Sequence, residues 1–189
     1  IDAMSGNNDK VQYDLPAMGG FTAGVSFADS GTNTGTDSTA YGFRYTTEAA
    51  GSSVTIGGAS ATQEVSGAVD KDSQNLGIKI VNGNLSFAMS QGTEEAADEN
   101  QEMMGAALSY KMGNGMTIGA YTVDGDDSLD AGEEYTASGV EVQYTIASGL
   151  TAVVIVEDYE YKAPTTADAN GTTTGDSGTN SRLVIKASF

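Results

Sequence analysis

The sequence predicts an all-β chain that folds as a transmembrane antiparallel up-and-down β-barrel. Three observations predict this fold. Apolar and polar residues alternate with a period of two in eleven segments, and no helical period competes with this pattern. The connections between the segments alternate strictly between short and long along the chain. The acidic residues are concentrated in the long connections.

Each expected strand has an apolar or aromatic residue at every second position. In the second strand Phe21, Ala23 and Val25 alternate with small polar residues, and in the ninth strand Val140 and Val142 alternate with Glu141 and Gln143. The eleven expected strands cover residues 9–15, 20–28, 38–47, 52–62, 73–81, 84–90, 102–112, 116–123, 135–146, 150–161 and 180–189.

The two classes of connection predict which side of the barrel each strand end faces. The short class contains the Gly or Asn that tight hairpins need, and covers residues 16–19, 48–51, 82–83, 113–115 and 147–149. The long class covers residues 29–37, 63–72, 91–101, 124–134 and 162–179, and holds 17 of the 26 acidic residues. An antiparallel meander places alternate connections on opposite sides, so one side is minimal and the other elaborated, as in outer-membrane barrels.

Composition excludes several functional classes. The net charge of −18 repels phosphate backbones, which argues against a nucleic-acid partner. The chain has no His and no Cys, which argues against zinc enzymes and Ser-His or Cys-His hydrolases. Glu157 and Asp158 are adjacent on a strand and therefore point to opposite faces, so they cannot form a catalytic acid/base pair. No enzymatic activity is predicted.

Two alternatives to a membrane barrel are weaker. The regular apolar alternation argues against a disordered acidic chain. A soluble antiparallel sheet with its apolar face on a core is the second alternative. Its polar face would be an outer surface, whereas small residues mixed with isolated charges suit the wall of a water channel better. No run approaches the roughly 18 apolar residues of a transmembrane helix, so membrane spans must be strands.

Five tyrosines lie near the ends of expected strands. Tyr135, Tyr159 and Tyr161 are near the long connections, and Tyr110 and Tyr144 are near the short turns. We expect both groups to form aromatic girdles at the two membrane interfaces.

Both ends of the chain resemble known porins. The last strand carries Leu183, Ile185 and Ala187 on one face and ends at Phe189, which resembles the assembly signal of bacterial outer-membrane barrels. The opening segment 7–16, with its Asn-Asn and Tyr-Asp-Leu-Pro elements followed by Gly20 and Phe21, resembles the stretch of Gram-negative general porins that leaves the inward-folded constriction loop and forms their sixth strand.

This resemblance implies a location, a function and partners. The eleven strands would be strands six to sixteen of a sixteen-stranded barrel, so residues 1–189 are expected to form a single domain that is the C-terminal portion of a larger barrel. The barrel would lie in the bacterial outer membrane and pass ions and small hydrophilic solutes by passive diffusion, without a cofactor. Its partners would be outer-membrane lipid, lipopolysaccharide and two further copies in a homotrimer. The alternative function is a surface-exposed adhesin or receptor that acts through its acidic loops.

The expected pore-lining residues are the charged side chains in the polar phase of their strands: Lys10, Arg44, Glu141, Arg182 and Lys186. A basic side chain that faced lipid near the midplane would cost about 2–4 kcal/mol, so these residues should face the lumen or lie at an interface. The resemblance assigns Lys10, Arg44 and Arg182 to a basic wall opposite an acidic constriction loop, with ordinary solvated lumen charges as the alternative. Lys79 and Lys111 lie near short turns and should mark the periplasmic rim. The excess of carboxylates predicts a mild cation preference that weakens as salt rises.

The acidic segment 124–134 superficially resembles a calcium loop. It is not an EF-hand, because the sixth position is Leu129 in place of Gly and the twelfth is Tyr135 in place of Glu. Carboxylate density makes it a candidate for weak Ca²⁺ binding, beside the simpler interpretation of a solvated acidic loop. The candidate ligands are Asp124, Asp126, Asp127 and Asp130.

Overall fold

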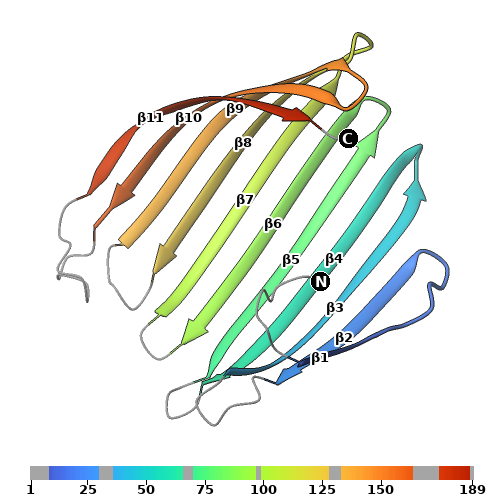
Figure 1. Cartoon of the computed structure of the whole chain (residues 1–189), viewed down its shortest axis with the longest axis vertical. Helices are drawn as coiled ribbons and strands as arrows, with labels where there is room; N and C mark the ends of the chain where they lie inside the picture. Colours follow the sequence, from blue (N-terminus) through green and yellow to red (C-terminus); the bar gives the residue numbers. More distant parts are fainter. Residues whose placement is uncertain are drawn as a thin grey trace.

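Eleven strands form one curved antiparallel sheet, in which each strand pairs with its neighbours in the sequence (Figure 1). The computed structural model describes residues 9–29, 36–65, 70–96, 99–127, 133–163 and 175–187. The strands are β1 Asp9–Asp14, β2 Phe21–Asp29, β3 Thr36–Ala49, β4 Ser52–Val65, β5 Lys71–Asn82, β6 Leu85–Ala96, β7 Glu99–Lys111, β8 Met116–Asp127, β9 Glu133–Ala147, β10 Leu150–Lys162 and β11 Asp176–Ala187. The predicted number of strands and their sequential pairing are confirmed.

The strands extend further toward the long connections than the sequence predicts. Strand β6 continues to Ala96, beyond the expected end at residue 90, and β8 continues to Asp127. The intervals between strands at this end shrink to residues 30–35, 66–70, 97–98, 128–132 and 163–175. Thirteen of the 17 acidic residues assigned to long connections therefore lie in strands. Both neighbours still supply backbone hydrogen bonds beyond the apolar section, so polar side chains do not end the strand.

The short turns are tight because their residues adopt left-handed backbone conformations. In the β3–β4 turn Ala49 pairs with Ser52, and the two residues between them have φ values of 50° at Ala50 and 76° at Gly51. Positive φ at both positions matches the twist of the flanking strands in a two-residue hairpin. One glycine in each of the other expected short turns also adopts positive φ: Gly19, Gly83, Gly115 and Gly149.

The register separates the side chains onto two faces of different chemistry. Paired residues share a face, so Ile80, Phe87 and Leu108 lie in one row across β5, β6 and β7, while Lys79, Ala88 and Ala107 lie in the next row on the opposite face. We refer to the face of the Ile80 row as the convex face and that of the Lys79 row as the concave face, for the hollow described below. Large apolar side chains on the convex face are widely exposed, with Leu183 at 67% and Leu76 at 57%.

No second layer covers the apolar face in the described part of the chain. The only buried hydrophobic residues there are Ala28, Ala40, Ala137 and Val153. A soluble sheet would need a core that buries its large apolar side chains against another element. The soluble alternative therefore lacks its core, and the convex face requires an apolar solvent.

The convex face changes chemistry from the short turns to the long connections. Along β5 it carries Ile80, Ile78 and Leu76, then Gln74, then Asp72. Along β6 the order is Phe87 and Met89, then Gln91 and Thr93, then Glu95. This order matches an apolar band in hydrocarbon, a polar zone at the interface and carboxylates in water on the long-connection side.

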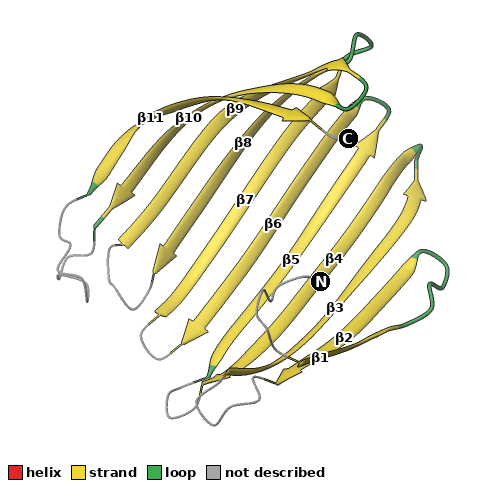
Figure 2. Cartoon of the chain, in the orientation of Figure 1, coloured by secondary structure: helices red, strands yellow, loops and turns green. Residues whose placement is uncertain are grey.

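The described residues contain strands, turns and short loops (Figure 2). In this part of the chain no helix is long and apolar enough to cross a membrane. The sheet is open, because β1 pairs only with β2 and β11 pairs only with β10.

Adjacent residues on β6 test the assignment of the faces. Met89 is on the convex face, whereas Ser90 is on the concave face between Gly77 and Gly105. We expect Met89→Arg to lower the free energy of unfolding in bilayers by about 2–4 kcal/mol, because the guanidinium would enter hydrocarbon. Ser90→Arg, the matched control, should change it by much less. Urea unfolding in lipid vesicles followed by circular dichroism measures both, and equal costs would contradict the assignment.

Candidate functional site on the concave face

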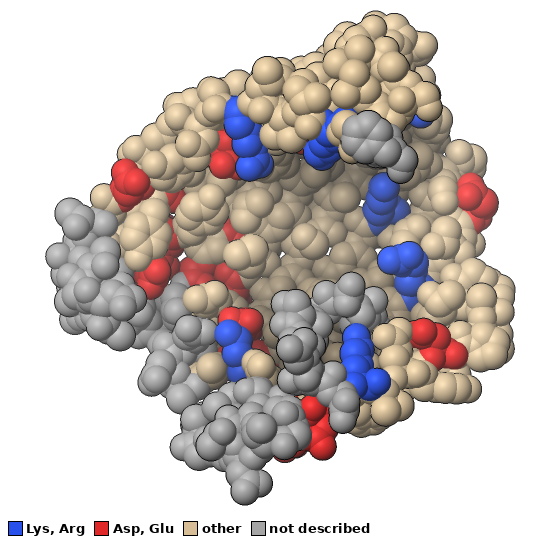
Figure 3. Space-filling model, viewed as in Figure 1, with Lys and Arg blue, Asp and Glu red and all other residues tan. Residues whose placement is uncertain are grey.

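The basic residues gather on the hollow face of the sheet (Figure 3). Seven of the eight Lys and Arg residues share the concave face in the register: Lys10, Arg44, Lys71, Lys79, Lys111, Arg182 and Lys186. Glu141 also lies there, between Gly119 and Ile155. All five residues that the sequence identifies as pore-lining are therefore on one face. Lys162 is the exception and pairs with Glu134 on the convex face, with 2.5 Å between Nζ and Oε2.

The two signs of charge are unevenly distributed along the concave face, although the carboxylates Asp14 and Glu48 lie near the short turns. Lys79, Lys111 and Lys186 lie within three residues of a strand end on the short-turn side. Four carboxylates lie in the half toward the long connections: Glu94, Glu133, Glu157 and Asp176. Lys71 lies there too, with Nζ 2.7 Å from Glu94 Oε1. The sequence interpretation missed Lys71 because it placed this residue in a long connection, whereas β5 begins at Lys71.

On the concave face the side chain of Tyr121 extends from β8 across β9 to β10. Tyr121 on β8, Gly139 on β9 and Glu157 on β10 occupy one row of the register. The Tyr121 hydroxyl donates a hydrogen bond to Glu157 Oε2. A Cβ atom added at Gly139 would lie 2.7 Å from both Cζ and Oη of Tyr121, so the glycine leaves the space that the ring fills. The row therefore couples three strands through one side-chain contact.

Two further tyrosines hold carboxylates in the same region. The Tyr161 hydroxyl donates to Glu133 Oε1 at 2.9 Å, and the Tyr159 hydroxyl donates to Asp176 Oδ2 at 3.1 Å. Each hydrogen bond stabilises and orients a carboxylate on the concave face.

The expected girdle of tyrosines at the long-connection end is wrong. Tyr135, Tyr159 and Tyr161 are on the concave face, because Val154 and Val156 occupy the convex phase of β10 and Tyr135 pairs with Tyr161. The position of these tyrosines along their strands suggested the girdle. The face of a side chain is decided instead by whether its residue is odd or even in the alternation along the strand. At the short-turn end Tyr110 and Tyr144 do lie on the convex face.

The two candidate calcium ligands whose side chains the structure describes lie on a strand. Asp124 and Asp126 lie on β8 and point to the convex face, spaced by two strand residues, or about 6.8 Å. The side chain of Asp127 and the whole of Asp130 are outside what the structure describes. Among the described residues no three acidic side chains converge to hold a metal ion. The proposed assembly signal Phe189 and residues 7–8 of the opening segment are also outside the described residues.

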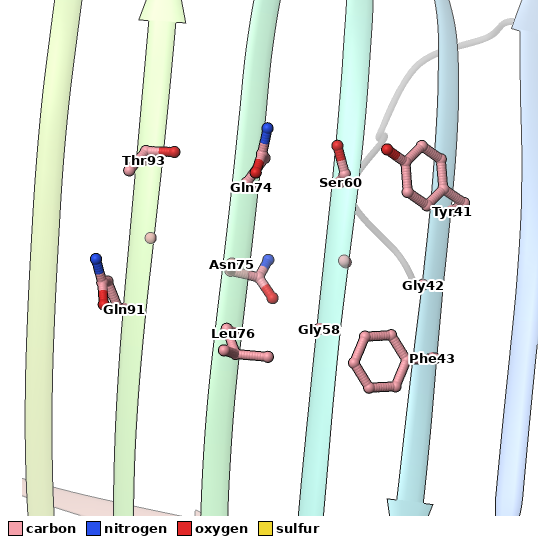
Figure 4. Close-up of a pocket in the computed structure, with 12 residues that line it drawn as sticks. Tyr41, Gly42, Phe43, Gly58, Ser60, Gln74, Asn75, Leu76, Gln91 and Thr93 are labelled. Carbon is pink, nitrogen blue, oxygen red and sulfur yellow. The ribbon is translucent and has the colours of Figure 1, made fainter.

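A hollow of about 440 Å³ opens on the other face (Figure 4). Phe43 and Leu76 lean toward each other over Gly58, where an added Cβ would lie 3.1 Å from the Phe43 ring. Ser60, Gln74 and Thr93 form its polar side. These side chains are on the convex face, where its apolar residues give way to polar ones. This hollow therefore opens on the side opposite to the basic residues.

Comparisons with known proteins agree with this arrangement. A family model described as Gram-negative porin matches residues 2–164. No curated protein matches the sequence.

Several solved structures share the fold. Acinetobacter baumannii OccAB4 gives a TM-score of 0.75 at 12% identity, over 95% of this chain and 52% of that one. An anion-selective porin from Comamonas acidovorans gives 0.72 at 18% identity, over 96% and 59%. Pseudomonas aeruginosa OpdK, solved with vanillate, gives 0.76 at 10% identity, over 94% and 55%. The chain thus spans between half and three fifths of the length of these proteins.

The Tyr121–Gly139 contact yields a test by non-additivity. Gly139→Ala should lower the free energy of unfolding by about 1–3 kcal/mol, because the new methyl group displaces the Tyr121 ring. In a Tyr121→Ala background the same change should cost almost nothing. Gly119→Ala is the matched control, since its Cβ would meet its nearest atom at an ordinary 3.5 Å. Urea unfolding of the four variants measures the coupling, and additive costs would contradict the contact.

Proposed function

The chain belongs to the Gram-negative porin family of the bacterial outer membrane, and from this premise we propose that its concave face lines part of a water-filled pore. The observation that carries the proposal is the separation of chemistry between the two faces of a single-layer sheet. One face exposes large apolar side chains, and the other carries seven basic residues and their carboxylate counterparts. Only a sheet with lipid on one side and water on the other satisfies both faces.

We assign roles to the charged residues on this basis. Lys10, Arg44, Glu141, Arg182 and Lys186 contact the permeating ions and small hydrophilic solutes. The convex face contacts outer-membrane lipid, with its carboxylates at the level of the lipopolysaccharide head groups. No step in this function requires catalysis or a bound cofactor.

The distribution of charge supports a mild cation preference. The chain carries 26 acidic and 8 basic residues, and carboxylates line the concave face toward the long connections. Cations are therefore concentrated at this mouth over about a Debye length, ~8 Å at physiological ionic strength. A structural neighbour is titled an anion-selective porin, so the shared fold does not determine the sign of selectivity. The charged side chains on the concave face determine the sign of selectivity.

Conduction is the direct test of the pore. Full-length protein in planar bilayers should give stable current steps that are ohmic in voltage. We also propose the homotrimer that the general-porin resemblance implies, so high voltage should close each inserted unit in three equal steps. A protein that inserts without conducting would contradict the pore and favour an adhesin or receptor. Single-step closure would contradict the trimer alone.

Selectivity is tested by removing one positive charge from the wall. Arg44→Gln should raise the cation-to-anion permeability ratio on the order of twofold, which corresponds to about 0.5 kcal/mol for a solvated charge. Lys162→Gln is the matched control, because Lys162 lies on the convex face and should leave the ratio unchanged. Reversal potentials in a KCl gradient measure the ratio. The permeability ratio should fall toward unity as the salt concentration rises. A preference for anions at low salt would contradict the proposal.

A further inference from the structure

A small hollow lies at the long-connection rim of the sheet, between β7, β8 and β9. Its volume is about 110 Å³. Met103, Gly125 and Tyr135 occupy one row of the register across these strands, so the glycine forms the floor and the two larger side chains form the walls. Tyr135 is 38% exposed and Met103 is 54% exposed, which leaves the ring and the thioether accessible.

The polar side chains that line this rim pocket from the concave face include Gln101, Glu133 and Tyr161, and of these only Glu133 is acidic. Glu133 lies beside the walls, and the Tyr161 hydroxyl donates to its Oε1 at 2.9 Å. Glu102 and Asp126 also border the hollow, but their side chains pair with each other on the convex side of the sheet. No Lys or Arg lines it among the described residues.

We propose that the rim pocket binds the ammonium or guanidinium head of a small organic cation. Tyr135 presents an aromatic face, which attracts a cation through the ring quadrupole. Glu133 supplies a charge-assisted hydrogen bond, and the Tyr161 hydroxyl orients the carboxylate that accepts it. Met103 contributes a polarisable wall against the apolar part of the ligand. The ligand class follows from the combination of ring, carboxylate and hollow, and not from the acidic residues alone.

The arrangement of the carboxylates selects against a bare metal ion. Glu133 is on the concave face, whereas Glu102 and Asp126 are on the convex face, so the sheet backbone lies between them. In the described part of the chain no three acidic groups converge as metal ligands. An organic cation spreads its charge over several hydrogen-bond donors and needs only one close carboxylate.

This inference goes beyond the proposed pore, because binding at the rim is measured at equilibrium and does not require conduction. The test is a titration of the full-length protein in detergent with methylguanidinium chloride, followed by saturation-transfer NMR. Methylurea is the neutral ligand of the same shape, and CaCl₂ is the metal competitor. Methylguanidinium should bind at least about tenfold more tightly than methylurea, as a charge-assisted hydrogen bond predicts.

Two pairs of variants locate the site. Glu133→Gln should weaken methylguanidinium binding at least about tenfold, whereas Glu134→Gln, on the convex face, should not. Gly125→Ala should abolish binding by filling the floor, and its Cβ would meet the nearest atom at an ordinary 3.4 Å, so the strand is not strained. Gly105→Ala on β7 is its control, with a nearest contact of 3.5 Å.

Three outcomes would overturn the proposal. Equal binding of methylurea would show that charge is not recognised. Displacement of methylguanidinium by CaCl₂ at ionic strengths where NaCl has no effect would show a metal site. Unchanged binding in both Glu133→Gln and Gly125→Ala would place the ligand elsewhere. Loss of conduction with binding intact would contradict only the pore, so the two proposals fail separately.

Discussion

Antiparallel hydrogen bonding between sequence neighbours is the constraint on which the rest of this structure depends. Each strand from β2 to β10 pairs with the strands before and after it, so the backbone groups inside the sheet are satisfied without help from side chains. Because pairing sets the register, it also decides the face of every side chain. A shift of one residue at Lys79 would carry its ammonium to the lipid side and a neighbouring Ile to the water side.

The two faces follow from this constraint and need no core. A sheet of one layer leaves its apolar face without a protein partner, and the gradient from Ile80 through Gln74 to Asp72 on β5 matches the bilayer profile. The concave face uses the opposite phase for charge. The stability of the sheet therefore comes from contacts within it. Examples are the Tyr121 ring over Gly139 and the hydrogen bond from Tyr121 to Glu157, which link β8, β9 and β10.

The distribution of charge on the concave face is not determined by the fold. The positions of Lys79, Lys111 and Lys186 near the short turns, and of Glu133, Glu157 and Asp176 toward the long connections, are a matter of side-chain choice on a fixed register. Any of these residues can change without disturbing the backbone pairing. Structures with the same fold and identities of 10–18% to this chain accordingly include a porin titled anion-selective.

The sequence by itself determined the strand count, the order of pairing, the short turns and the faces of Arg44, Glu141 and Arg182. These properties depend on local periodicity and on turn residues such as Gly51 and Gly83, which act over a few positions. Tertiary pairing decided where the strands end, because neighbours extend β6 to Ala96 and β8 to Asp127 in spite of their polar sequences. Tertiary pairing also decided which side chains from different strands are neighbours. Tyr121 and Glu157 are 36 residues apart, and Met103 and Tyr135 meet across Gly125 only because three strands align, which no local pattern encodes.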